Sequence, residues 1–142
     1  ILATQECKRH GYDEAIMLDK DGNVSEAPGE NIFVIKNKII YTPNMDSSIL
    51  EGITRDTVIT LAKDLGYTIV QRTIARSELY TAEEIFLTGT AAEIIGVISV
   101  DGKNIGDGKE GQITKIIRNT YNEIATCNSS NEKYRGWTTE VW

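Results

Sequence analysis

The order of apolar and polar positions over residues 15–43 is typical of strands. A short apolar run at 15–18 leads into a polar turn that ends in glycine, and the chain resumes at 23–26. Two β-branched, apolar runs at 31–35 and 38–42 flank Lys36-Asn37. Residues 27–30 contain proline and glycine together, which predicts a loop. The pattern therefore predicts two successive hairpins in an antiparallel first part of the chain.

Beyond residue 48 the apolar residues take helical spacing in two places. Val58, Leu61, Ala62 and Leu65 recur at i, i+3, i+4 and i+7, which predicts a helix that Gly66 ends. The most regular amphipathic helix is predicted further on, from Ile113, Ile116, Ile117, Tyr121 and Ile124.

Strands are predicted between these helices at residues 68–70, 84–88 and 94–100. The last of the three is expected to close at the turn Asp101-Gly102. Strands and helices together indicate one α/β domain, α+β-like in its mixed sheet.

Composition and charge exclude several classes of partner. The chain has 142 residues, 40% hydrophobic and 25% charged, which suits one globular domain. Its net charge of -6 and its scattered basic residues argue against nucleic-acid and membrane-surface partners, which need a concentrated basic face. Neither a membrane-length apolar run nor a signal peptide is present. Cys7 and Cys127 lack a second thiol or histidine at metal-ligand spacing, so we expect a cytoplasmic protein with reduced thiols and no metal site.

Two loops of small residues are candidates for anion binding. The segment Leu50-Glu51-Gly52-Ile53-Thr54 opens the first predicted helix, where free backbone N–H groups and the positive end of the helix dipole meet. The segment Gly89-Thr90-Ala91-Ala92 directly follows a predicted strand and also offers amides and a hydroxyl. From spacing alone, an ordinary helix cap or a tight strand exit is the more common explanation of either loop.

Charged residues supply the other candidates. Glu26 lies in a rigid turn between strands, where a carboxylate can hold a protonated ring nitrogen, although composition alone favours an ordinary solvated turn. We expect Arg72 and Arg76 to pair with nearby acids, and Glu83-Glu84 to form a solvated start to a strand.

Four segments in register resemble the class IV pyridoxal-phosphate aminotransferases, especially the branched-chain amino-acid type. The resemblance covers almost the whole chain and implies the large C-terminal domain of the fold-type IV, D-amino-acid aminotransferase-like fold. The segments that carry it are Gly11-Tyr12-Asp13-Glu14-Ala15, Ser25-Glu26-Ala27-Pro28-Gly29-Glu30-Asn31, Glu51-Gly52-Ile53-Thr54-Arg55-Asp56 and Leu87-Thr88-Gly89-Thr90-Ala91-Ala92-Glu93-Ile94.

The resemblance implies pyridoxal 5′-phosphate as cofactor and a role for each matching residue. Glu26 would accept a hydrogen bond from the pyridine nitrogen, and Leu50 would pack against a face of the ring. Amides and hydroxyls at the two loops would bind the phosphate, and two amides of the second loop would also hold the substrate carboxylate. The phosphate residues implied are Ile53, Thr54 and Thr90, and the substrate residues are Thr90 and Ala91.

One departure from the family pattern concerns the lysine that holds the cofactor covalently. In the family it lies shortly before the segment that begins here at Ile1, and no lysine of this chain stands in a matching context. Since the first residue is not methionine and residues 1–10 read as the back half of a helix, we expect residues 1–142 to be the C-terminal cofactor-binding domain of a longer enzyme. The smaller N-terminal domain would be missing, and the chain would hold no catalytic residue of its own.

The resemblance also implies an activity for the longer enzyme. It would transfer the amino group of leucine, isoleucine or valine to 2-oxoglutarate, as a homo-oligomer, while residues 1–142 alone would be inactive. Two other branches of the family, the D-amino-acid aminotransferases and the aminodeoxychorismate lyases, share the same cofactor apparatus and are alternatives for the longer enzyme. An alternative of another class is a noncatalytic module that binds a phosphate-bearing ligand or serves as a dimerisation surface.

Overall fold

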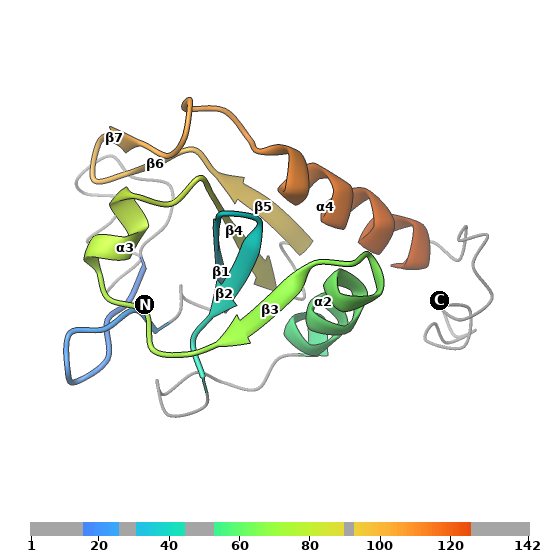
Figure 1. Ribbon diagram of the computed structural model, residues 1–142, viewed down its shortest axis with the longest axis horizontal. Helices are drawn as coiled ribbons and strands as arrows, with labels where there is room; N and C mark the ends of the chain where they lie inside the picture. Colours follow the sequence, from blue (N-terminus) through green and yellow to red (C-terminus); the bar gives the residue numbers. More distant parts are fainter. Residues whose placement is uncertain (1–15, 26–30, 45–52, 90–92, 126–142) are drawn as a thin grey trace.

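The structure, a computed structural model, describes residues 16–25, 31–44, 53–89 and 93–125 (Figure 1). A five-stranded sheet in the order β3-β2-β1-β4-β5 forms its centre, and β6 and β7 form a separate two-stranded sheet. The elements are β1 (Asn31–Lys36), β2 (Ile39–Thr42), α2 (Ile53–Asp64), β3 (Thr68–Gln71), α3 (Ser77–Tyr80), β4 (Glu84–Gly89), β5 (Glu93–Val97), β6 (Ser99–Val100), β7 (Lys103–Asn104) and α4 (Gln112–Ala125).

The predicted hairpin at residues 31–42 is confirmed as the antiparallel pair β1–β2, although its turn lies one residue later than predicted. The two residues between the strands, Asn37 and Lys38, have φ of 53° and 63°. Positive φ at both loop residues is the geometry of a type I′ turn, whose twist matches that of the strands it joins. In the earlier predicted hairpin, the described residues form one antiparallel bridge, Leu18 with Val24.

The first predicted helix is confirmed as α2, with one error at its end. Val58, Leu61 and Ala62 are fully buried, but Leu65 is 39% exposed. The helix ends at Asp64, and the amide of Tyr67 donates to the Ala62 carbonyl across a left-handed Gly66. This glycine cap turns the chain before Leu65 can join the buried stripe. The chain then returns as β3, parallel to β2.

The predicted strand at residues 94–100 is wrong in its extent. β5 ends at Val97, and Ile98 is 50% exposed where the chain leaves the main sheet. The next two residues form β6, which pairs with β7 across a turn at Asp101 and Gly102 with φ of 51° and 78°. Because residues 99–100 pair with β7 and not with the main sheet, β5 is shorter than the apolar run at 94–100 predicted.

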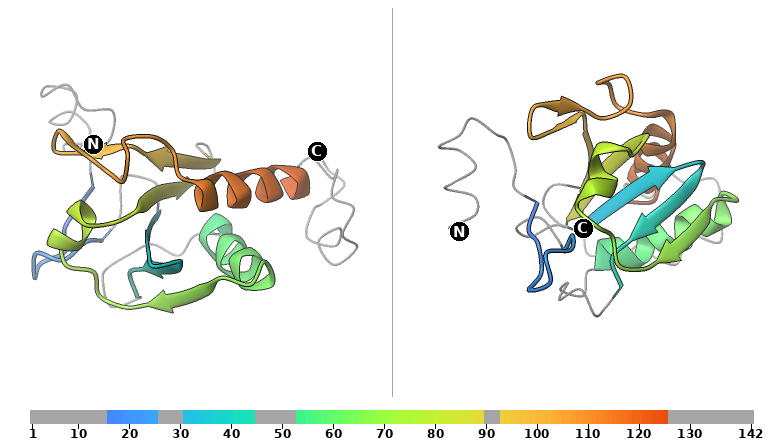
Figure 2. Two further views of the ribbon diagram at one scale, coloured as in Figure 1. Left: turned by 45° about the horizontal axis from the view of Figure 1, so that its top comes forward. Right: turned by 60° about the vertical axis from the view of Figure 1, so that its left-hand side comes forward.

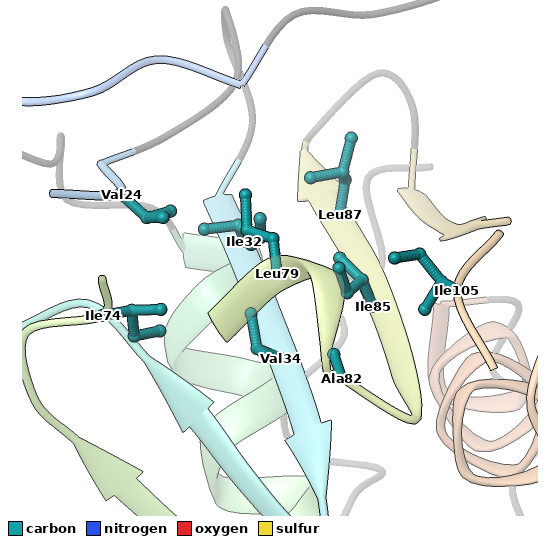
Figure 3. Packing of buried hydrophobic residues seen from close by; sticks show 9 residues of the cluster. All are labelled: Val24, Ile32, Val34, Ile74, Leu79, Ala82, Ile85, Leu87 and Ile105. Atoms are coloured by element: carbon teal, nitrogen blue, oxygen red, sulfur yellow. The ribbon is translucent and has the colours of Figure 1, made fainter. Parts of the chain in front are cut away.

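Buried side chains cover both faces of the central sheet. Alternation along β1 places Ile32 and Val34 on one face, in a cluster with Ile74, Leu79 and Ile105 that Figure 3 shows together with its other members. Phe33 and Ile35 lie on the opposite face. There, Phe33 stacks on Phe86 with ring centroids 4.8 Å apart. In Figures 1 and 2, α2 and α4 lie side by side, with α3 at the other side of the sheet.

The carboxylate of Glu84, at the start of β4, caps the first turn of helix α4. The amide of Ile113 donates to Glu84 Oε2 at 3.2 Å, and the amide and hydroxyl of Thr114 each donate to Glu84 Oε1 at 2.9 Å. The prediction that Glu84 is only a solvated start to a strand is therefore wrong. Its carboxylate satisfies the free N–H groups of the first turn of α4 and complements the helix dipole.

Candidate functional site

Two of the predicted site segments are joined to neighbouring strands at one end of the sheet. β1 begins at Asn31, directly after residues 26–30, and β4 ends at Gly89, directly before residues 90–92. Asn31 and Thr88 are paired in the antiparallel register of these strands. The chain therefore enters and leaves the two segments at adjacent positions.

The first turn of α2 lies at the same end. The Arg55 guanidinium donates through NH2 to the Pro43 carbonyl at 3.0 Å and to Gln71 Oε1 at 3.2 Å. Pro43 follows β2, and Gln71 is the last residue of β3. The Thr42 hydroxyl in turn donates to the Ile32 carbonyl at 2.9 Å, next to the start of β1. Three predicted segments thus border one end of the sheet. We call this end the rim; it comprises the start of β1, the ends of β2, β3 and β4, and the first turn of α2.

This rim is lined by buried polar side chains on the face that α2 covers. Residues two apart in a strand share a face, so Asn31, Thr42 and Thr88 lie on the same face as Phe33, Ile40 and Phe86 respectively. Those three apolar residues belong to the cluster that contains α2 residues. Polar side chains are rarely buried in such number without a purpose for their hydrogen-bonding groups. The buried polar residues at this rim are Asn31, Thr42, Thr54, Arg55 and Thr88.

Two polar atoms at the rim are buried without a hydrogen-bond partner among the described residues: Arg55 Nε and Thr88 Oγ1. Arg55 is only 4% exposed, and Asp56, whose carboxylate lies 3.7 Å away, has a side chain that is 63% exposed. Burial lowers the pKa of the Arg55 guanidinium, with Asp56 opposing the shift. An arginine stays charged at neutral pH even so, and a buried cation with spare donors favours an anion nearby.

The structure describes two of the predicted site residues. Thr54 is 7% exposed in the first turn of α2, and Ile53 is the first residue of that helix. Glu26, Leu50, Thr90 and Ala91 lie outside the described residues. Their roles, and those of Ile53 and Thr54, therefore remain predictions.

Sequence reasoning gave no role to Arg55 or Thr88. For Arg55 a signal existed, because it lies at i−3 and i−7 from Val58 and Ala62, on the apolar stripe of α2. A charged residue on that stripe is buried unless the helix is frayed. For Thr88 the pattern offers no signal, since threonine is common in strands.

Arg72 and Arg76 pair with acids, as predicted. Arg72 contacts Glu78 at 2.6 Å and lies 4.3 Å from the centre of the Tyr41 ring, while Arg76 contacts Asp101 at 3.3 Å. The hydrogen bond from Arg72 holds the pKa of Glu78 below its usual value. These two arginines are engaged away from the rim.

Within 16–25, 31–44, 53–89 and 93–125, no group of three or more histidine, cysteine or acidic side chains is placed to hold a metal ion. Over the same ranges, each helix is too short or too polar to cross a membrane.

The chain is similar to known aminotransferases. The sequence model of the amino-transferase class IV family matches residues 1–100. The chain is 49% identical, over 142 residues, to a probable branched-chain-amino-acid aminotransferase of Aquifex aeolicus, and 44% identical to the branched-chain-amino-acid aminotransferase of Escherichia coli K12. Each match covers 99% of this chain and 45% of the relative, so the chain spans about half the length of these proteins.

Solved structures of branched-chain amino acid aminotransferases have the same fold as this chain. The T.th. branched-chain amino acid aminotransferase, complexed with N-(5′-phosphopyridoxyl)-L-glutamate, superposes with a TM-score of 0.94 at 43% identity, over 99% of this chain and 46% of that one. The enzyme of Thermoproteus uzoniensis with norvaline gives 0.93 at 45% identity, over 99% and 46%. At this level of identity the likeness confirms the fold predicted from the four segments.

Proposed function

Because this chain belongs to the class IV aminotransferases, we propose that it is the cofactor-binding part of a branched-chain amino-acid aminotransferase. The family depends on pyridoxal phosphate. The proposed reaction transfers the amino group of leucine, isoleucine or valine to 2-oxoglutarate. Relatives of that name, at 44–49% identity over nearly the whole chain, support this substrate class over the D-amino-acid and aminodeoxychorismate branches.

The residues at the rim fit the phosphate end of the cofactor. A phosphate dianion needs hydrogen-bond donors and positive charge, and the N-terminus of α2 supplies both through its free amides and its dipole. The buried Arg55 adds a fixed charge in the same helical turn, with a donor to spare. The observation that carries the proposal is this convergence of a helix N-terminus, a buried cation and two strand ends at one rim.

The individual roles follow the matching positions. The amides of Ile53 and Thr54 and the hydroxyls of Thr54 and Thr90 would bind the phosphate. Leu50 would pack against the ring, and Glu26 would accept a hydrogen bond from the ring nitrogen. By keeping that nitrogen protonated, the Glu26 carboxylate preserves the electron demand of the ring.

When bound, pyridoxal phosphate supplies the electron sink that makes the substrate α-proton removable. The proposed part of this chain in the reaction is to bind and orient. The amides of Thr90 and Ala91 hold the substrate carboxylate, and Glu26 holds a proton at the ring nitrogen. The base that moves the α-proton is the family lysine, which residues 1–142 do not supply, so we propose that these residues alone are inactive.

The proposal extends to the longer protein. Residues 1–142 would form its C-terminal large domain, next to a smaller N-terminal domain that completes the substrate pocket. The enzyme would act in the cytoplasm on small amino acids and 2-oxo acids, as a homo-oligomer.

Replacement of Glu26 in the full-length enzyme tests the proposal. Loss of a charge-assisted hydrogen bond of about 1.5–3 kcal/mol lowers kcat by roughly ten- to a hundredfold if the bond stabilises the transition state. Leucine turnover with 2-oxoglutarate is measured for Glu26→Ala and for Asp21→Ala, an exposed control in the same predicted hairpin. Equal turnover in both variants would remove the ring-nitrogen role. Absence of transamination by the unmodified enzyme would leave only a phosphate-binding module.

A further inference from the structure

Thr88 has a buried hydroxyl that the fold itself does not use. Its side chain is 0% exposed, and Oγ1 has no hydrogen-bond partner among the described residues. Such a group loses its bonds to water on folding and gains nothing in return. Valine has the same shape and fits a strand equally well. A threonine at this position is explained if a ligand completes the hydroxyl's bonding.

The Thr88 side chain points to the side of the sheet that α2 covers. Residues 86 and 88 share one face of β4, and Phe86 belongs to the cluster that contains Val58 of α2. The neighbouring side chains, Ile85 and Leu87, belong to the cluster on the opposite face. Thr88 is thus separated from that opposite core.

Thr88 and the N-terminus of α2 also lie at the same end of the sheet. β2 and β4 both pair antiparallel with β1, so they run in one direction, and both end at the rim. Helix α2 starts beside the end of β2, where Arg55 bonds the Pro43 carbonyl, and leads away to the start of β3. Moving along β4 from Phe86 to Thr88 therefore leads toward Thr54, at the start of the helix.

We propose that Thr88 is a further cofactor-binding residue, whose Oγ1 donates a hydrogen bond to the phosphate group held at the N-terminus of α2. The Thr88 hydroxyl adds a buried donor from β4 to the amides at the N-terminus of α2. The inference rests on the proposed cofactor site and adds a residue to it. A bond from a neutral hydroxyl to a dianion is charge-assisted, which makes its loss measurable.

The test compares Thr88→Val and Thr88→Ser in the 142-residue chain. Pyridoxamine 5′-phosphate and pyridoxamine are titrated separately and followed by calorimetry. Thr88→Val should weaken binding of the phosphate ester about tenfold and leave pyridoxamine binding unchanged, whereas Thr88→Ser should retain the affinity. Thr88→Val should also raise the melting temperature of the ligand-free chain, because an unpaired buried polar atom has been removed.

Thr114→Val is the matched control. Thr114 is also 0% exposed, but its hydroxyl is bonded to Glu84 at the opposite end of β4. This variant should lower the melting temperature and leave both affinities unchanged. The opposite signs of the two stability changes distinguish a hydroxyl that awaits a ligand from one that serves the fold.

Several results would overturn the inference. Equal affinity of wild type and Thr88→Val for pyridoxamine 5′-phosphate would remove Thr88 from the site while leaving the proposed function intact. A melting temperature lowered by Thr88→Val would mean that the hydroxyl serves the fold. A wild-type chain that binds the phosphate ester no better than pyridoxamine would contradict the proposed phosphate site, and this inference with it.

Discussion

Gly111 leaves room for the carboxylate that caps α4, and its replacement by alanine gives a sharp test of the packing. A Cβ at this position would overlap the Cδ and Oε1 atoms of Glu84. Both approaches are far inside van der Waals contact. The Glu84 side chain must therefore swing away, and the three hydrogen bonds that it accepts from Ile113 and Thr114 are lost.

The expected cost follows from those bonds. Loss of a helix cap costs roughly 0.5–2 kcal/mol, and hydrogen bonds to a charged group contribute about 1.5–3 kcal/mol each, net of the bonds to water. We expect Gly111→Ala to lower the free energy of unfolding by about 2–4 kcal/mol. In a Glu84→Ala background the same change meets no carboxylate, so it should stay within about 1 kcal/mol of neutral.

Urea denaturation of wild type, the two single variants and the double variant completes a double-mutant cycle. The predicted coupling energy between positions 84 and 111 is about 2 kcal/mol or more. If the two effects add without coupling, the carboxylate does not occupy the space that Gly111 provides, and the capping account is wrong.

Two groups of charged residues and the lysines of the chain give three further tests. Arg55→Met should lower the free energy of unfolding by about 1–3 kcal/mol, because it leaves the Pro43 carbonyl unpaired; unchanged urea midpoints would refute this anchoring role. Arginine partners hold the pKa of Glu78 and of Glu110 below 4.5, so stability is kept above that pH and lost as the pH falls below it. A Glu78→Gln/Glu110→Gln variant should therefore show a shallower loss in urea denaturation below pH 4.5, and parallel curves would contradict it. Borohydride reduction of the 142-residue chain with pyridoxal phosphate should leave no stoichiometric adduct at one lysine by mass spectrometry, and a single labelled site would disprove covalent incompetence.

Local patterns predicted the elements whose signals are local. The β1–β2 hairpin follows from two β-branched runs around a turn, and α4 from an apolar stripe of regular period. Leu65 was misplaced because the glycine cap ends α2 one residue earlier than its stripe. The strand at 94–100 was drawn too long because an apolar run does not show which partner each half pairs with.

Contacts between distant segments could not be predicted in this way. Glu84 lies about thirty positions from the amides that it caps, and Arg55 joins the ends of two strands. Such contacts depend on how the sheet is assembled, which periodicity within a segment does not encode. The two loops are candidates for anion binding from their positions before a helix and after a strand, and the likeness to a family adds their assignment to the cofactor phosphate. Only Ile53 and Thr54 of that predicted site fall within the described residues.

A crystal structure of the chain with pyridoxamine 5′-phosphate tests the central claim most directly. The account predicts phosphate oxygens at hydrogen-bonding distance, about 2.7–3.2 Å, from the backbone amide of Thr54, with the Glu26 carboxylate at the ring nitrogen. A phosphate bound away from the N-terminus of α2, or a ring nitrogen without Glu26, would contradict it.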